Sequence, residues 1–158
     1  MSIEKVREYF KENGVDVHRI RVFEESSATV PLAAKALGCS EERIAKTLSF
    51  QFEEGCILIV AAGDAKVDNR KYKETFGIKA KMLAPDVVAN MVGHAVGGVC
   101  PFAVNQGICI YLDESLKRFD TVFPACGSSN SAIEVTIPEL EHLSRAKGWV
   151  DVCKLPTG

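Results

Sequence analysis

Hydrophobic residues recur at helical spacing in several short segments of the chain. Ile3, Val6 and Phe10 share one face of a helix that begins after Ser2 and is stopped by Gly14. Proline or a capping residue at the start, or glycine at the end, marks further helices in the same way. They are expected at 31–37, from Ser40 to Lys46, at 68–75, at 85–92 and from Thr136 to near Gly148, with one helical turn at 113–116.

Other segments are continuous apolar runs or alternate between apolar and polar residues, as strands do. Residues 46–52 and 56–62 are joined by Glu53-Glu54-Gly55 and predict a hairpin. Residues 121–125 and 131–137 predict a second hairpin around the polar turn 127–130. Further strands are expected at 15–23, 78–82, 103–112 and 149–153.

These elements predict a single α/β domain of residues 1–158. About seven strands, with hairpins and irregularly spaced helices, favour a mixed, largely antiparallel central sheet with helices packed against it. The pattern shows no internal repeat and no linker that would separate a second domain.

Composition narrows the class of protein. Hydrophobic residues make up 47% of the 158 residues and charged residues 25%, as in ordinary globular domains. The apolar run 56–62 is too short to span a bilayer, and the first residues are amphipathic and charged, unlike a signal peptide. A cytoplasmic location and no membrane partner are therefore expected. The net charge of −2 excludes a protein that coats nucleic acid non-specifically.

Six cysteines and three histidines raise the question of disulfides or a metal. The cysteines lie far apart without a Cys-x-x-Cys pair, and the histidines are scattered. The thiols are expected to be reduced, and neither a structural metal nor a cofactor is predicted.

The segment His94–Phe102 combines two adjacent glycines with a Cys-Pro pair. Gly97 and Gly98 allow unusual backbone angles and let a ligand approach main-chain N–H groups, and Pro101 fixes the exit from the turn. Such a loop could hold a carbonyl or an oxyanion. The plainer interpretation, a tight connection between a helix and a strand, is open on these residues alone.

Lys46 stands between apolar neighbours, where packing does not need a lysine. Its ammonium could neutralise a phosphate or polarise a carbonyl, and we expect it at the mouth of a pocket within reach of Gly97 and Gly98. A lysine that extends from a strand end into solvent is an equal alternative. Four further lysines, Lys71, Lys73, Lys79 and Lys81, suit phosphate contact or simply a solvated face.

Cys100 and His94 also suggest a thiol nucleophile with its base. A catalytic thiol needs a lowered pKa, which the sequence does not show. We rank this pair below a mechanism that uses the loop backbone, and expect Cys100 to be dispensable as a nucleophile.

In order and spacing, four segments resemble the YbaK/prolyl-tRNA-synthetase-associated-domain family. They are Ile44-Ala45-Lys46-Thr47-Leu48, Gly63-Asp64-x-Lys66-x-Asp68, Val96-Gly97-Gly98-Val99-Cys100-Pro101-Phe102 and the hairpin 127–135. The resemblance covers nearly the whole chain and implies a barrel-like sheet. Members are trans-editing hydrolases, or editing domains of synthetases, that cleave a wrong amino acid from tRNA.

The resemblance implies a role for each matching residue. Lys46 would orient the 3′-terminal adenosine or its phosphate, and Gly97 and Gly98 would bind the ester carbonyl. The substrate-binding set would be Phe23, Thr47, Asp64, Val99, Cys100, Pro101, Gly127 and Asn130. No protein nucleophile is implied, because water or the substrate's own thiol attacks. The tRNA acceptor end, and a prolyl-tRNA synthetase, are the implied partners.

Departures from the family pattern leave the amino acid open between cysteine and alanine. Cysteine-specific members tend to have a basic turn and then an acidic residue where this chain has 127–130 and Ala132. Asn130-Ser131-Ala132 is closer to the Asn-Thr-Ala of alanine-specific members, yet Cys126 replaces their histidine.

The function predicted from the sequence is therefore a stand-alone aminoacyl-tRNA deacylase. A non-catalytic module that binds aminoacyl-tRNA or a synthetase is the main alternative, and a Cys100 thiol hydrolase is the third.

Overall fold

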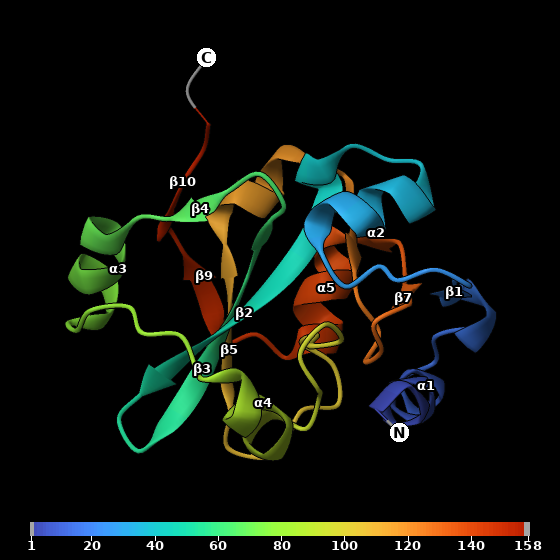
Figure 1. Cartoon of the computed structure of the whole chain (residues 1–158), viewed down its shortest axis with the longest axis horizontal. Helices are drawn as coiled ribbons and strands as arrows, with labels where there is room; N and C mark the ends of the chain where they lie inside the picture. The colour runs from blue at the N-terminus through green and yellow to red at the C-terminus, as the bar shows by residue number, and fades with distance from the viewer. Residues whose placement is uncertain (1, 157–158) are drawn as a thin grey trace.

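A computed structural model describes residues 2–156 of the chain, and its centre is a curled six-stranded sheet (Figure 1). The sheet curls into about half a barrel, as the resemblance implied. In spatial order its strands are β8 (Val135–Thr136), β6 (Thr121–Pro124), β2 (Ile44–Phe52), β3 (Gly55–Ala62), β5 (Cys109–Asp113) and β9 (Gly148–Val150).

The sheet is mixed, as predicted, but antiparallel pairing does not predominate. β2 and β3 form the predicted antiparallel hairpin, with a register from Ala45↔Ala62 to Phe52↔Gly55, and β6 pairs antiparallel with β8. The remaining three neighbours, β2 with β6, β3 with β5 and β5 with β9, are parallel. Parallel neighbours require long crossovers, and helical segments between these strands provide them.

Two small antiparallel sheets lie beside the central one. β1 (Arg21–Val22) pairs with β7 (Ser131–Ala132), and β4 (Lys66–Val67) pairs with β10 (Cys153–Lys154). The first joins the start of the chain to the polar loop 127–130 that follows β6.

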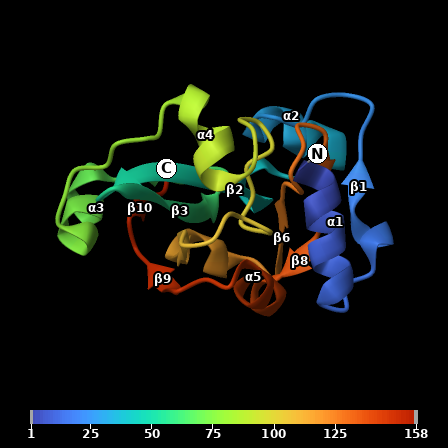
Figure 2. The same ribbon diagram turned by 90° about the horizontal axis from the view of Figure 1, so that it is seen from below.

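Within residues 2–156, five α-helices surround the sheet where the caps predicted them: α1 (Ser2–Glu12), α2 (Val30–Leu37), α3 (Asn69–Phe76), α4 (Pro85–Val92) and α5 (Ile137–Ser144). The Thr136 hydroxyl accepts the Glu139 N–H in the expected capping box. Figure 2 shows α4 and α5 on opposite sides of the sheet, with α1 beside β6 and β8. None of the helices within residues 2–156 is long and apolar enough to cross a membrane.

Several predicted strands and helices are wrong wholly or in part. Segment 131–137 is not one strand but β7 and β8, which pair with β1 and β6, and 149–153 is divided between β9 and β10. The helix that begins at Thr136 ends at Ser144 and not near Gly148.

Most of 15–23 is not a strand, because the Asp16 carboxylate caps a 3₁₀ turn, η1 (Val17–Arg19). Residues 78–82 form no strand and contribute only one isolated β-bridge, Phe50↔Met82. In 103–112 the strand begins only at Cys109, because Gly107 has a φ of 87°, which interrupts an extended backbone. The helix after Ser40 is a short 3₁₀ turn, η2 (Glu41–Arg43), and the predicted turn after β5 is a third, η3 (Glu114–Arg118).

The main hydrophobic core lies along β3, where residues 57–62 are all buried. α1 contributes Val6 and Phe10, both with no exposed surface, and Phe10 packs edge-on against Phe102. A smaller cluster of Ala33, Ala34, Ile44 and Phe123 lies between α2 and the start of β2. The cavity described next opens beside this second cluster.

Candidate active site

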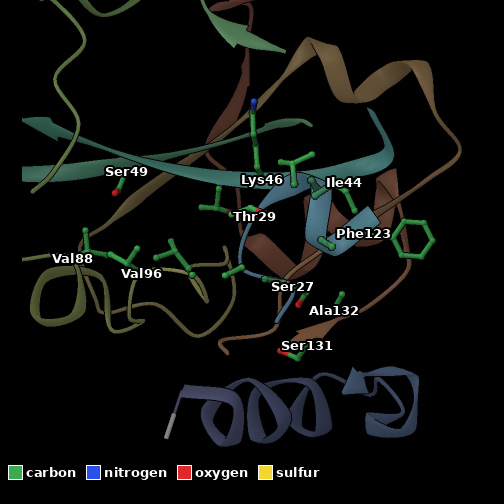
Figure 3. A pocket seen from close by; sticks show the side chains of 18 of the residues that line it. Ser27, Thr29, Ile44, Lys46, Ser49, Val88, Val96, Phe123, Ser131 and Ala132 are labelled. Carbon is green, nitrogen blue, oxygen red and sulfur yellow. The ribbon is translucent and has the colours of Figure 1, made fainter. Parts of the chain in front are cut away.

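A cavity of about 250 Å³ lies between the sheet and a group of loops (Figure 3). One side is formed by β2, and another by the segment before α2 together with α2 itself. Residues 82–88 and the loop 93–102 close it opposite the sheet, while β6 and β7 form its floor. It is a concave site of the kind in which small ligands bind.

Most of the lining is apolar, and the polar side chains in it are hydroxyls: Ser27, Thr29, Thr47, Ser49 and Ser131. Lys46 is the one charged residue that lines the cavity within the described part of the chain. The lining therefore offers neutral hydrogen-bonding groups on an apolar surface. It offers no carboxylate or imidazole that could act as a general base.

The loop that carries the two glycines contains a tight turn. The Gly98 N–H donates to the Ala95 carbonyl at 3.0 Å, and Gly97, the third residue of the turn, has a φ of 93°. A type II turn needs such a φ at this position, which explains the glycine. Between residues 2 and 156 nothing accepts a hydrogen bond from the N–H groups of Gly97 and Val99, and both residues line the cavity.

Gly98 differs from Gly97 in what surrounds it. A β-carbon on Gly98 would lie 2.8 Å from the backbone N of Ser128 and 2.9 Å from the carbonyl carbon of Gly127. Gly98 is buried and does not line the cavity, and its N–H is already used in the turn. Its lack of a side chain lets two loops touch backbone to backbone.

The His94 side chain joins the start of the loop 93–102 to its end by a hydrogen bond. Its Nε2 lies 2.7 Å from the Phe102 carbonyl oxygen, which it can reach only as a donor, and Nδ1 is buried without a partner among the described residues. Burial lowers the pKa of His94 and so favours the neutral ring.

Cys100 does lie beside His94, with Sγ 3.5 Å from Nε2, but it is unsuited to nucleophilic attack. The thiol has no exposed surface, does not line the cavity, and its pKa is raised to about 12 by burial. A nucleophilic thiol requires the opposite shift. The pair packs the base of the loop.

The Lys46 ammonium does not reach towards the glycine loop as expected. Nζ donates to the carbonyl oxygens of Gly63, at 3.3 Å, and of Ala65, and Figure 3 shows the side chain directed away from Val96. Burial lowers the pKa of Lys46. In this structure the ammonium holds the turn after β3.

Thr47, to which the resemblance gave a substrate-binding role, lines the cavity wall. Its hydroxyl oxygen is buried and has no hydrogen-bond partner among residues 2–156. Buried hydroxyls are almost always paired, so an unpaired one on a cavity wall is suited to a ligand atom.

Val99 lines the cavity together with Thr47, whereas the remaining predicted substrate-binding residues lie outside the lining. Asn130 donates from Nδ2 to the Phe23 carbonyl at 2.8 Å, while the Phe23 N–H donates to the Asn130 carbonyl at 2.7 Å. This pair fixes the loop 127–130 against the strand that precedes α2. Pro101 is buried next to Cys100, and Gly127 lies against Gly98 and outside the lining.

Asp64 lies outside the lining too, in the turn that Lys46 holds. Its carboxylate is bound by both terminal nitrogens of Arg118, at 2.6 and 3.1 Å, and this guanidinium lowers the pKa of Asp64. The ion pair occupies the carboxylate in this structure.

Several lining residues were not anticipated from the sequence. They come from the segment before α2, from 82–88 and from the floor: Ser27, Ala28, Thr29, Met82, Leu83, Pro85, Val88 and Phe123. Small and apolar residues such as these carry no chemical signal in a sequence. Other lining residues do lie in motifs that the sequence singled out, namely Ile44, Ala45, Val96, Ser131 and Ala132.

The part of the chain that the structure describes contains no group of three or more His, Cys, Asp or Glu residues able to hold a metal ion.

The chain is similar in sequence to an editing-domain family and to two kinds of bacterial protein. Residues 24–143 match the family model of the aminoacyl-tRNA editing domain. The uncharacterized protein YwhH of Bacillus subtilis is 55% identical over 155 residues, which are 98% of each chain. The proline–tRNA ligase of Halalkalibacterium halodurans is 29% identical over 104 residues, 65% of this chain but 18% of the ligase.

A solved structure of similar fold is that of a candidate trans-editing enzyme for prolyl tRNA synthetase. It superposes with a TM-score of 0.86 at 28% sequence identity, and the match covers 97% of both chains. The likeness therefore extends over nearly the whole of both chains.

Proposed function

The chain belongs to the aminoacyl-tRNA editing domain family, and from this premise we propose that it is a hydrolase that removes wrongly attached amino acids from tRNA. We further propose that it acts in trans, as a stand-alone protein. Similarity over the full length of YwhH, and of a candidate trans-editing enzyme, supports this choice.

The observation that carries the proposal is the pair of unpartnered amides on the cavity wall. Gly97 and Val99, whose N–H groups have no acceptor among residues 2–156, line a pocket in which Lys46 is the one titratable side chain. Donors fixed in advance stabilise the negative charge that develops on an ester carbonyl oxygen during attack. The sequence prediction assigned this role to Gly97 and Gly98, and we now assign it to Gly97 and Val99, because the Gly98 N–H already closes the turn.

In this mechanism the ester carbonyl of the aminoacyl group lies against those amides. A water molecule, or the substrate's own side chain, attacks the carbonyl carbon, and the bond from this carbon to the ribose oxygen breaks. The ribose oxygen takes up the proton that the attacking group gives up, and the tRNA leaves with a free 3′-terminal hydroxyl. The acyl group leaves as the free amino acid when water attacks, or as a cyclic thioester when the substrate's own thiol attacks. Cys100 takes no part as a nucleophile, in agreement with its burial.

We propose that the substrate is a small, uncharged amino acid, such as alanine or cysteine, on a proline tRNA. The apolar lining with neutral hydroxyls supports an uncharged side chain, because Lys46 is assigned to the phosphate and no other lining group in the described chain would compensate a buried charge. The unpaired Thr47 hydroxyl supplies a hydrogen bond to a polar atom of the aminoacyl group.

Lys46 is proposed to bind the phosphate of the terminal nucleotide, the role that the resemblance implied. To do so its ammonium must exchange the carbonyls of Gly63 and Ala65 for the phosphate, a rotation that a lysine side chain allows. Phe23, Asp64, Pro101, Gly127 and Asn130 then act indirectly, as residues that fix the loops around the cavity.

The partners that follow are the acceptor end of the tRNA and a prolyl-tRNA synthetase that produces the mischarged substrate. Cytoplasm, where translation takes place, is the proposed location.

The test is incubation with a panel of mischarged tRNAs, with correctly charged prolyl-tRNA as the reference. Release of free amino acid from alanyl- or cysteinyl-tRNA, with prolyl-tRNA spared, is the expected result. Retention of the aminoacyl-tRNA without release would instead support the binding module. Inactivation by an alkylating agent with a trapped acyl-enzyme would support the thiol hydrolase.

A further inference from the structure

Helix α1 lies outside the segment that matches the editing family, yet it contacts both ends of the glycine loop. The matched segment is 24–143, and α1 is Ser2–Glu12. The Ser2 hydroxyl donates to the Gly93 carbonyl at 3.2 Å, where the loop begins. Phe10 packs on Phe102, where the loop ends, with ring centroids 4.9 Å apart. The helix therefore runs along the base of the loop from its first residue to its last.

The same end of α1 also touches the loop 127–130. A β-carbon on Gly127, which has a φ of 91°, would lie 2.8 Å from the Ser2 carbonyl oxygen and 3.1 Å from the Ile3 nitrogen. Contacts this short leave no room for a side chain. Figure 2 shows the N-terminal end of α1 beside this loop, and Figure 3 shows the helix beneath Ser131 and Ala132.

These contacts continue from α1 to the cavity through backbone alone. Ser2 lies against Gly127, Gly127 and Ser128 lie against Gly98, and Gly97 of the same turn lines the cavity beside Ala28. Backbone segments in direct contact transmit a displacement, because packed interiors compress very little. A shift of the start of α1 would thus move the Gly97 amide.

We propose that α1 is the positioning element of the cavity, and that Ser2 and Gly127 together set where the Gly97 turn lies. This inference rests on the proposed function, since it concerns the amides that would hold the ester carbonyl. A purely structural role for α1, supported by the complete burial of Val6 and Phe10, is the competing explanation.

The chain offers a matched pair of glycines that separates the two explanations. Gly127 and Gly107 have nearly the same φ, 91° and 87°, so alanine at either position causes similar backbone strain. A β-carbon on Gly107 meets nothing within 4 Å, whereas on Gly127 it collides with Ser2 and Ile3. The difference between Gly127→Ala and Gly107→Ala therefore reports the contact with α1.

Both variants are compared with the parent in deacylation of alanyl- and cysteinyl-tRNA. Gly127→Ala is expected to lower kcat/KM by up to about 100-fold, because small misplacements of a catalytic group have effects of that order. It should also change the ratio of kcat/KM for the two substrates, a ratio that does not depend on the fraction of folded protein. Gly107→Ala should keep the parental ratio and nearly the parental rate.

Removal of the Ser2 hydroxyl tests the same contact between α1 and the loop with a smaller structural change. Ser2→Ala should lower kcat/KM by roughly two- to tenfold, the range for one lost hydrogen bond. Ser2→Thr keeps the hydroxyl and should restore most of the activity.

Amide hydrogen exchange provides a readout that needs no substrate. In Gly127→Ala, amides in 93–102 should exchange faster than in Gly107→Ala, while β2 and β3 remain equally protected in both. If the parent hydrolyses tRNA but the two alanine variants match in substrate ratio and in exchange of 93–102, the positioning role is wrong. If the parent hydrolyses nothing, the proposed function fails, and the exchange comparison still decides whether α1 positions the loop.

Discussion

The two walls of the cavity are built in different ways. The sheet wall, which consists of Ala45, Thr47 and Ser49 on β2, is part of a nine-residue strand paired with β3 along almost its whole length. The loop wall, which consists of 93–102 with 127–130 behind it, contains no strand in either of these two segments. It is held by a histidine, an asparagine and glycine-to-backbone contacts.

Under the proposed function, this difference separates the wall that selects the amino acid from the wall that acts on the ester. Pairing of β2 with β3 fixes the positions of the side chains on the sheet wall, so that wall is suited to determine which amino acid fits. The loop wall presents main-chain N–H groups, whose direction depends on a few contacts behind them. Substitutions in the loop wall should therefore change the rate most, and those in the sheet wall should change selectivity with smaller losses.

The largest effect is expected from Gly98→Ala in the loop wall. Its β-carbon would collide with the backbone of Ser128 and shift the turn, so the oxyanion donors would be misplaced. Loss of one such donor lowers kcat on the order of 100- to 1,000-fold. Because Gly98 is buried, overpacking should also cost about 1–3 kcal/mol of stability. Deacylation kinetics and thermal melting measure the two effects.

Gly55→Ala is the control, because Gly55 also lacks a positive φ and its β-carbon would meet nothing within 4 Å. It should leave the rate unchanged. Parental activity in Gly98→Ala at normal melting temperature would mean that the loop is only a connection between α4 and β5.

A smaller loss of activity is expected from Lys46→Met on β2. Methionine keeps much of the aliphatic part of the lysine side chain and removes its charge. A hydrogen bond from a charged group contributes about 1.5–3 kcal/mol, so kcat/KM should fall roughly 10- to 100-fold. Melting should also occur at a lower temperature, because the carbonyls of Gly63 and Ala65 lose their donor. Exposed Lys66, nearby on β4, is the control, and Lys66→Met should show neither change. Equal kinetics in the two variants would remove Lys46 from the mechanism.

Thr47→Val tests the sheet wall without changing its shape. The unpaired hydroxyl is buried, so its removal should leave the melting temperature the same or raise it. If that hydroxyl binds the substrate, kcat/KM should fall roughly three- to tenfold. A variant that is destabilised and fully active would contradict both parts of this prediction.

Acid should loosen the loop wall before the sheet wall. The pKa of His94 is lowered from its ordinary value of 6.5 by burial and by nearby Lys5, so the unfolded chain takes up the proton first as the pH falls. The contribution of neutral His94 to the stability of the folded state is therefore present above a pH of about 6.5 and is lost as the pH falls below that value. Protection of amides in 93–102 should decrease from pH 7 to pH 5, while that of β2 and β3 persists. His94→Gln should abolish the difference.

The smallest effect is expected from Cys100→Ser, which should retain substantial activity. The thiol is buried, has a pKa raised to about 12 and does not line the cavity. Complete inactivity together with a covalent adduct in the parent, seen by mass spectrometry, would revive a thiol mechanism.

The same contrast explains how far the sequence predicted the fold. The helices were found because caps and stops such as Thr136-x-x-Glu139 and Gly38 act within a few residues. The hairpin of β2 and β3 was found because its apolar runs flank a short turn. Segments 15–23 and 78–82 were assigned as strands on side-chain pattern alone, and whether a strand forms depends on a partner that the pattern does not contain.

The sequence singled out Thr47 and the Gly97 turn, which line the cavity, but it did not indicate the direction of the Lys46 side chain or the close approach of Gly98 to Ser128. A main-chain contact such as that of Gly98 with Ser128 joins two segments that lie thirty residues apart along the chain. Such a contact is not indicated by the type of residue at either position. The apolar lining residues from Met82 to Val88 were missed for a related reason, because apolar residues that line a cavity are of the same types as those that fill a hydrophobic core.

The parallel pairings of the sheet bear on how the protein folds. β2 pairs with β6 through Ile44↔Phe123, and β3 pairs with β5 through Ile57↔Cys109, so each contact closes a long stretch of chain. Closing such loops costs entropy before the contact is made, and proteins rich in them fold slowly. The β2–β3 hairpin can form early and locally, whereas the floor of the cavity must wait for β6. During refolding from denaturant, recovery of deacylation should therefore lag behind recovery of the circular dichroism signal.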